Sequence, residues 1–259
     1  MDVFETIMVP FKWLVSAIMV GLHDVLSSAG MPAASGWTWT LSIIGLVLII
    51  RAALIPVFLR QVSAQRRMRL LQPELKKLQA KYQGKTDQLS RQAMAQEQMA
   101  LYKEHGTNPL SACLPMLIQV PFFLALFQVL SGIPAAAGQG QGIGAMSRDQ
   151  ALQFDASSIF GAPMPASVLH GGGDQGAVVL LTVLMILAMT VSQFITQRRI
   201  MVRNVPDESP DTPFARQQKV ILYILPLVFA AGGVYFPIGV LIYWTTTNLW
   251  TMAQQFTIK

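Results

Sequence analysis

Long apolar blocks, separated by short polar or basic segments, dominate the sequence. About 20 apolar residues in a helix cross a hydrocarbon core about 30 Å thick, and five blocks approach or reach that length. They cover residues 38–60, 109–131, 176–197, 219–235 and 238–256. The pattern predicts an all-α integral membrane protein with five transmembrane helices.

The distribution of charge supports this interpretation and predicts an orientation. Hydrophobic residues make up 53% of the chain and charged residues 12%, with a net charge of +6. The basic residues gather after the first and third spans and before the fourth, at Arg60, Arg66, Arg67, Arg69, Arg198, Arg199, Arg203, Arg216 and Lys219. Because basic loops stay in the cytoplasm, these ends and the C-terminus are expected to be cytoplasmic. The basic charge then requires no nucleic-acid partner.

Residues 61–106 form a polar insert between the first two spans. Leu71, Leu75, Leu78 and Tyr82 recur at helical spacing, which is typical of the seam of a helical hairpin. Gly84 is expected to end the first helix, and Thr86 or Asp87 to cap a returning helix that runs toward Glu104. The sequence predicts a cytoplasmic helical hairpin, although a solvated linker would show a similar pattern.

The N-terminal segment, residues 1–30, is harder to assign. Its apolar stretch at 7–27 is interrupted by Pro10 and Lys12 and contains Phe11 and Trp13. We expect an amphipathic helix that lies in the membrane interface on the extracytoplasmic side. A true span or an uncleaved signal segment is the alternative.

Two loops complete the predicted organisation. Residues 132–175 are rich in Gly, Ala, Pro and Ser and hold one basic residue, Arg148, which is typical of an extracytoplasmic loop. The loop could hold short interfacial helices near Ile159 and Val168, and no further span is expected there. Residues 198–216 are expected to form a cytoplasmic loop.

The sequence gives little indication of a catalytic function. Cys113 is the only cysteine, and the three histidines lie far apart in the chain. Neither a thiolate nor a histidine metal site is indicated, and no nucleotide-binding or hydrolase motif is present. We therefore expect no enzyme, no cofactor and no metal.

Arg51 is the residue that most needs explanation, because a charge at mid-bilayer costs about 2.5–3.5 kcal/mol on insertion scales. Its side chain could simply reach toward the headgroups. No Asp or Glu lies within the five predicted spans, so a hydrated cavity that faces the cytoplasm is the alternative that we favour. Gln119, Trp244, residues 245–247 and Asn248 could line it, although such residues often only join helices.

Four sequence blocks resemble the YidC family of membrane insertases, and the likeness extends over nearly the whole chain. They are IIRAALIPVF at 49–58, LQPELKKLQAKY at 71–82, NPLSACLPMLIQVPFFLALF at 108–127 and FPIGVLIYWTTTNLWTMAQQ at 236–255. The chain is most similar to the short Gram-positive type. It shows no large domain after its first helix, and the lack of a lipobox cysteine near its start favours an actinobacterial-type member. It also lacks the basic C-terminal tail that often aids ribosome contact in the family, so either that tail was removed or ribosome docking relies on other parts.

The resemblance implies an insertase and chaperone of the bacterial cytoplasmic membrane that works alone or with the Sec translocon. It implies a hydrophilic groove with Arg51, Gln119, Trp244 and Asn248 in it, and nascent membrane proteins, the lipid bilayer, the Sec translocon and the ribosome as partners. Two other functions stay open from the residues alone: a small-molecule or ion transporter, and a scaffold that only helps inserted helices fold.

Overall fold

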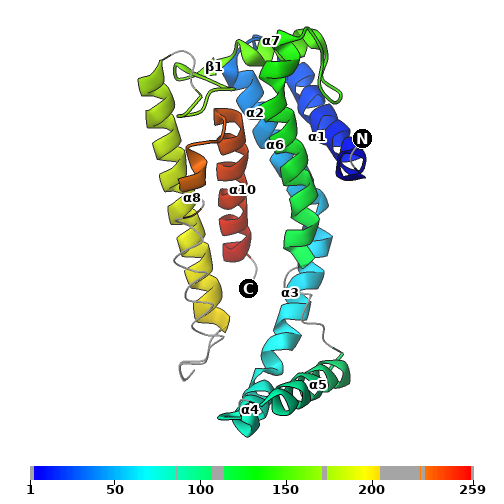
Figure 1. The fold of residues 1–259 in the computed structure, drawn as a ribbon. Helices are drawn as coiled ribbons and strands as arrows, with labels where there is room; N and C mark the ends of the chain where they lie inside the picture. Colours follow the sequence, from blue (N-terminus) through cyan, green and yellow to red (C-terminus); the bar gives the residue numbers. More distant parts are fainter. Residues whose placement is uncertain are drawn as a thin grey trace. The chain divides into compact units, whose positions relative to one another are not determined.

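The protein is described by a computed structural model that covers residues 3–85, 87–106, 114–170, 174–204, 228 and 231–257. This part of the chain is mostly helical (Figure 1). It divides into two compact units: unit 1 comprises Met1–Ile50 with Pro121–Lys259, and unit 2 comprises Arg51–Val120.

Four helices are long and apolar enough to cross a membrane among the residues described. They lie within α1 (Val3–Ser28), α2 (Gly36–Ala53), α6 (Leu114–Gly138) and α8 (Gln175–Asn204). The helix α10 (Ile238–Thr257) follows a turn at Val234 and Tyr235 and the linking residues Phe236 and Pro237. The predicted span 219–235 falls mostly outside the described residues, as does Cys113.

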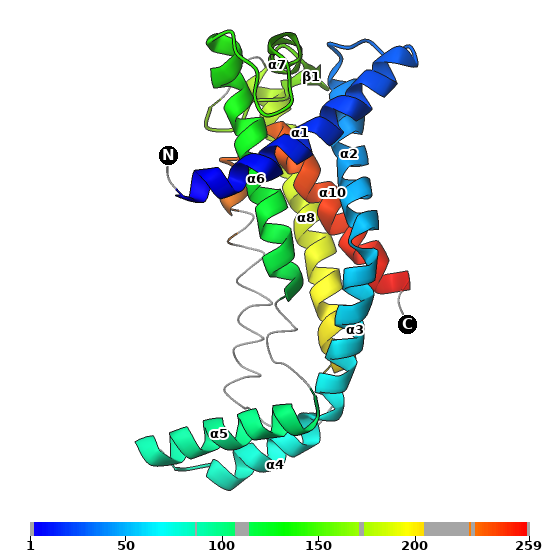
Figure 2. The ribbon, with the colours of Figure 1, turned by 90° about the vertical axis from the view of Figure 1, so that its right-hand side faces the viewer.

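The helix α1 crosses α2 and α6 obliquely within unit 1 (Figure 2). Its buried face includes Met8, Val15, Met19 and His23, whereas Trp13 on the opposite face is 58% exposed. By length and hydropathy α1 could also cross the bilayer, so the interfacial placement stays a prediction.

The predicted first span is not one continuous helix. The helix α2 ends at Ala53, and α3 (Ile55–Leu70) begins after a break at Leu54. Pro56 explains the break, because its ring nitrogen has no hydrogen to donate and its ring crowds the carbonyl four residues earlier. In contrast, α6 continues as a helix through Pro121 and Pro134.

The segment after α6 folds into a small helix and a two-stranded hairpin. The helix α7 (Arg148–Asp155) starts with a capping box between Ser147 and Gln150. The strands β1 (Ser158–Ile159) and β2 (Ala162–Pro163) then pair antiparallel. The helices predicted near Ile159 and Val168 are wrong: the chain turns through left-handed backbone at Phe160 and Gly161, and Pro163 cannot donate to a helix.

This segment joins α1, α2 and α10 in a well-packed region that we call the capped end of unit 1, formed around His23, Trp39, Phe154, Met164 and Ile238. His23 stacks on Trp39 with ring centroids 3.8 Å apart, and Phe154 meets Trp39 edge-on at 5.4 Å. His23 Nε2 also lies 2.8 Å from the carbonyl oxygen of Ala33. All five side chains are at most 2% exposed.

Hydrogen bonds attach α1 to the same end. The amide of Ala145 donates to Ser16 Oγ at 2.8 Å, and Gln150 Nε2 donates to Asp24 Oδ1 at 3.0 Å. The capped end therefore combines an apolar interior with polar ties between segments far apart in the chain.

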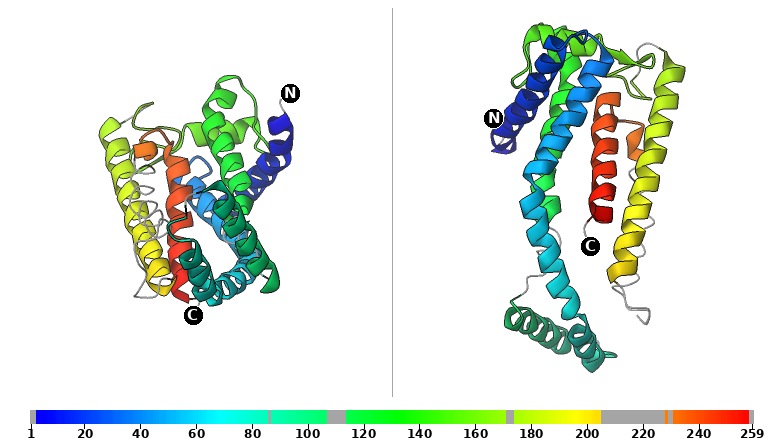
Figure 3. Two further views of the ribbon diagram at one scale, coloured as in Figure 1. Left: turned by 60° about the horizontal axis from the view of Figure 1, so that its bottom comes forward. Right: turned by 180° about the vertical axis from the view of Figure 1, so that it is seen from behind.

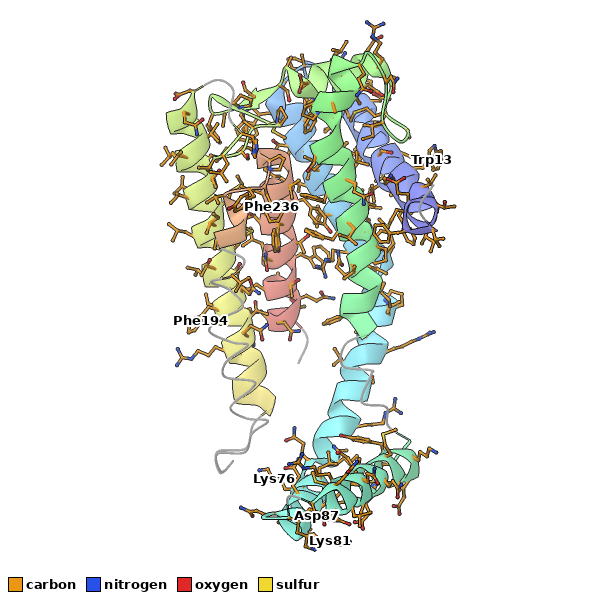
Figure 4. All side chains as sticks on the ribbon, in the orientation of Figure 1. Trp13, Lys76, Lys81, Asp87, Phe194 and Phe236 are labelled. Atoms are coloured by element: carbon orange, nitrogen blue, oxygen red, sulfur yellow. The ribbon has the colours of Figure 1, made fainter. Side chains whose placement is uncertain are left out.

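In unit 2, α4 (Gln72–Tyr82) and α5 (Gln88–Glu104) are joined by Glu97, which accepts hydrogen bonds from Lys81 Nζ at 2.7 Å and from the Tyr82 hydroxyl at 2.8 Å. Asp87 caps α5 by accepting from the Ser90 amide at 2.8 Å, which confirms the cap predicted at this residue. Figure 4 labels Lys81 and Asp87 on these helices.

These contacts have electrostatic consequences. The hydrogen bond from Lys81 holds the pKa of Glu97 below its ordinary value, and the same bond raises the pKa of Lys81. The bond from the Ser90 amide lowers the pKa of Asp87.

Candidate functional site

The first half of α10 is buried and tied to the capped end. Residues 238–243 are all buried. The amides of Ile238 and Gly239 donate to the carbonyl oxygens of Ala166 and Met164 at 2.9 and 3.0 Å. These bonds satisfy amides that have no partner within the helix. The segment that contains Met164 and Ala166 therefore acts as the N-terminal cap of α10.

The second half of α10 has a different character. From Trp244 to Thr257 none of its residues is fully buried. Polar side chains occur at most positions: Thr245, Thr246, Thr247, Asn248, Thr251, Gln254, Gln255 and Thr257. Several of these side chains donate hydrogen bonds to backbone carbonyl oxygens of α10. For example, Asn248 Nδ2 donates to the Trp244 carbonyl oxygen at 3.0 Å.

Three other polar atoms in this half are shielded and have no hydrogen-bond partner in the part of the chain described. They are Thr245 Oγ1, Thr247 Oγ1 and Trp250 Nε1. Shielded polar groups nearly always bind protein or water, because leaving one without a partner costs about 1–3 kcal/mol. The second half of α10 is therefore suited to contact with water or with a polar group of a bound molecule.

An aromatic cluster lies where the two halves of α10 meet. Phe123 and Phe127 of α6 are packed with Phe236, Tyr243 and Trp244, and adjacent ring centroids are 5.4–6.4 Å apart. Phe236, labelled in Figure 4, lies just before α10 and contacts both Phe127 and Trp244. This cluster lies between the buried half of α10 and the polar half.

The helix α8 lies beside α10 in both views of Figure 3. Near their C-terminal ends, the guanidinium carbon of Arg199 lies 3.9 Å from the centre of the Phe256 ring. This distance fits a cation–π contact. Arg199, expected in a cytoplasmic loop, is thus part of a helix that continues to Asn204.

The predicted groove residues are divided between the two units. Arg51, in the last turn of α2, and Gln119, in α6, are half-buried and belong to unit 2. Trp244 and Asn248 belong to unit 1, one turn apart on α10 and joined by a hydrogen bond. A groove that includes all four stays a prediction.

Phe123, Phe127 and Phe236 were not predicted as neighbours of Trp244. The spacing of Phe123 and Phe127 by one helical turn was the available signal. Across the described ranges, no group of three or more His, Cys, Asp or Glu side chains could hold a metal ion.

The fold and these surfaces define a multi-pass helical membrane protein. A profile of the 60Kd inner membrane protein family matches residues 31–259. The chain belongs to this family, whose curated relatives are named membrane protein insertase YidC. It is accordingly a multi-pass protein of the cytoplasmic membrane.

Individual relatives cover almost the whole chain. A protein named membrane protein insertase YidC from Streptomyces avermitilis is 43% identical over 98% of this chain and 58% of its own length. One from Tropheryma whipplei strain Twist is 41% identical over 98% of this chain and 84% of its own length. The resemblance to an actinobacterial YidC is thereby confirmed.

A crystal structure described as an active YidC insertase with its first transmembrane domain resolved has the same fold, with a TM-score of 0.55. It is 21% identical, and the match covers 100% of this chain and 48% of the crystallised one. The chain thus spans only 58% of the Streptomyces relative and about half of the crystallised insertase.

Proposed function

We propose that this protein inserts other proteins into the bacterial cytoplasmic membrane and helps them fold there. The observation that carries the proposal is the 41–43% identity, over 98% of the chain, to proteins named membrane protein insertase YidC. This activity is a transport function and requires no catalytic residue.

The contact site is proposed to be a hydrophilic groove with Arg51, Gln119, Trp244 and Asn248 in it. Support comes from the second half of α10, where Thr245, Thr247 and Trp250 carry shielded polar atoms that call for water or a polar ligand. Water in such a groove would shorten the apolar distance that a polar segment of the client has to cross.

Arg51 is proposed to attract acidic residues in the tail of the client. A positive charge in a narrow groove surrounded by lipid and protein is screened less than one in bulk water, so its attraction for a carboxylate is stronger there than in water. The client's own apolar helix then leaves the groove for lipid, with about 25 cal/mol gained per Å² of apolar surface buried. The membrane potential adds to the driving force on an acidic tail.

In the proposed topology the capped end is extracytoplasmic and the C-terminus is cytoplasmic. The capped end gathers the first residues of α2 and α10, whereas Arg60 and Arg198 follow the opposite ends of their apolar segments. Basic residues favour the cytoplasmic side. The helices α4 and α5 would then be available to the Sec translocon and the ribosome.

The function can be tested with the purified protein in liposomes that contain no other protein. A short single-span client with an acidic tail is synthesised in their presence, and protection of the tail from added protease measures insertion. We expect insertion with the wild type, a severalfold loss with Arg51→Ala and a smaller loss with Arg51→Lys, because lysine keeps the charge without the planar fork of donors.

A client with a neutral tail is the matched control, and its insertion should differ little among the three proteins. Equal behaviour of Arg51→Ala and Arg51→Lys on the acidic client would contradict the role of Arg51. Absence of insertion by the wild type, with flux of a small solute instead, would contradict the proposed function.

A further inference from the structure

Two exposed aromatic rings meet at the edge of the capped end. Trp37, in the first turn of α2, is 47% exposed, and Phe160, in the turn between β1 and β2, is 71% exposed. Their ring centroids are 5.2 Å apart at an interplanar angle of 79°, an edge-on arrangement. Contiguous exposed apolar surface can mark a site of contact with a membrane or with another molecule.

The pair is held in place by the backbone around it. Gly36 lies so close to the carbonyl of Ser158 that a β-carbon there would collide with it, so β1 is pressed against the start of α2. Figure 1 shows β1 beside this end of α2. The turn that presents the Phe160 ring has a φ of 50°, which is unfavourable for a bulky residue. The fold thus keeps an exposed phenylalanine in a strained conformation.

The surroundings of Trp37 indicate which partner fits. Leu41 and Leu48, spaced one and three turns further along α2, are 40% and 43% exposed and lie on the same face as Trp37. The helix α2 is long and apolar enough to cross a membrane, so this stripe suits lipid chains. Trp37 begins the stripe, where the aromatic belts of membrane proteins meet the headgroups.

We propose that Trp37 and Phe160 together insert at the boundary between headgroups and acyl chains, in the leaflet where α2 begins. Phospholipid is the partner, and the β1–β2 turn is a second anchor that sets the depth of the capped end. The contact does not depend on insertion of clients, so it can fail while the proposed function holds.

The proposal can be tested by spin labelling of the full chain in phosphatidylcholine–phosphatidylglycerol nanodiscs. Cys113→Ser removes the only cysteine, and Phe160→Cys or Trp37→Cys then introduces a single label site. Leu41→Cys is the control in lipid, and Asp149→Cys, on the exposed first turn of α7, is the control in water. Collisions with oxygen report lipid, and collisions with a water-soluble nickel complex report solvent.

We expect both labels of the pair to collide more with oxygen than with nickel, at a depth shallower than that of the Leu41 label. Two results would overturn the proposal. Nickel accessibility equal to that at Asp149 would place the pair in water. Poor accessibility to both reagents would mean that protein covers the pair. Two label sites keep the test valid if one substitution disturbs the turn.

Discussion

The two halves of α10 have opposite environments although they belong to one helix. Residues 238–243 are all buried, and their first amides are capped by the carbonyls of Met164 and Ala166. Beyond the aromatic cluster at Trp244 no residue is fully buried, and three shielded polar atoms have no partner among the described residues. The first half of α10 packs into the protein interior, and the second half presents polar side chains.

This contrast is consistent with the proposed function. A packed and hydrogen-bonded end resists the passage of water, whereas a half-buried polar surface accommodates it. The aromatic cluster lies at the border and keeps the two environments apart. Substitutions at the buried end of unit 1 should destabilise the protein, and isosteric changes at threonines of α8 and α10 test whether water reaches the polar half of α10.

The largest effect is expected from Trp39→Ala in the capped end. Trp39 is fully buried and contacts both His23 and Phe154, so its removal should cost about 3–5 kcal/mol of unfolding free energy. Thermal unfolding in detergent measures this loss. Trp37→Ala, at a half-exposed tryptophan two residues earlier, should change stability far less in detergent. Equal losses of stability in Trp39→Ala and Trp37→Ala would show that the stacked rings contribute little to the stability of the capped end.

Gly36→Ala should be the next most damaging change. A β-carbon at Gly36 would meet the backbone of Ser158, which cannot move aside as a flexible side chain does. Overpacking of this kind costs about 1–3 kcal/mol. Gly21→Ala, in α1 with nothing within 4 Å of the added carbon, is the matched control. That control should be neutral or stabilising by about 0.5–1 kcal/mol, since alanine favours helix.

Two isosteric threonine-to-valine changes test whether water reaches the polar half of α10. Thr182 of α8 is 1% exposed, and its hydroxyl has no hydrogen-bond partner in the described chain, so Thr182→Val should stabilise by about 1 kcal/mol. Thr247 Oγ1 on the polar half of α10 is shielded in the same way. If the proposed groove holds water that reaches this hydroxyl, Thr247→Val should change stability by less than about 0.5 kcal/mol. An equal gain at both positions would mean that the polar half is dry.

The smallest effect is expected in unit 2, at the exposed pair Lys81 and Glu97. The lowered pKa of Glu97 means that its contribution to stability is present above the ordinary value near 4.5 and is lost as pH falls through the lowered pKa. The raised pKa of Lys81 means that its contribution is present below 10.5 and is lost as pH rises through the raised value.

Glu97→Gln should remove both of these pH dependences of stability and cause a slight loss of helicity. Circular dichroism recorded as a function of pH measures both effects. Glu104→Gln, at an exposed carboxylate in the last turn of α5, is the control and should leave them unchanged. A pH profile of Glu97→Gln identical to that of the wild type would show that the pair does not stabilise these helices.

The helical membrane fold could be predicted because its signal is long and local. Runs of apolar residues identify the helices, and single residues such as Asp87 mark where one begins. The family was also recognisable, because blocks such as FPIGVLIYWTTTNLW combine unusual residues in order.

The capped end could not be predicted for a physical reason. His23, Trp39 and Phe154 meet only through tertiary packing, and nothing in their local sequence encodes that contact. The β1–β2 turn depends on left-handed backbone at Phe160, a residue that seldom adopts it, so a helix was expected there. The placement of Arg51 and Gln119 in a groove is still a prediction.

Site-specific photocrosslinking tests directly whether a client contacts Gln119 and Trp244 during insertion. A photoreactive amino acid is placed at Gln119 or Trp244, or at Leu184, a 53% exposed position on α8 that serves as control. A single-span client with an acidic tail is then synthesised. We expect crosslinks to the client from Gln119 and Trp244 that weaken in Arg51→Ala, and few from Leu184. Insertion without a crosslink from either groove position would contradict the account.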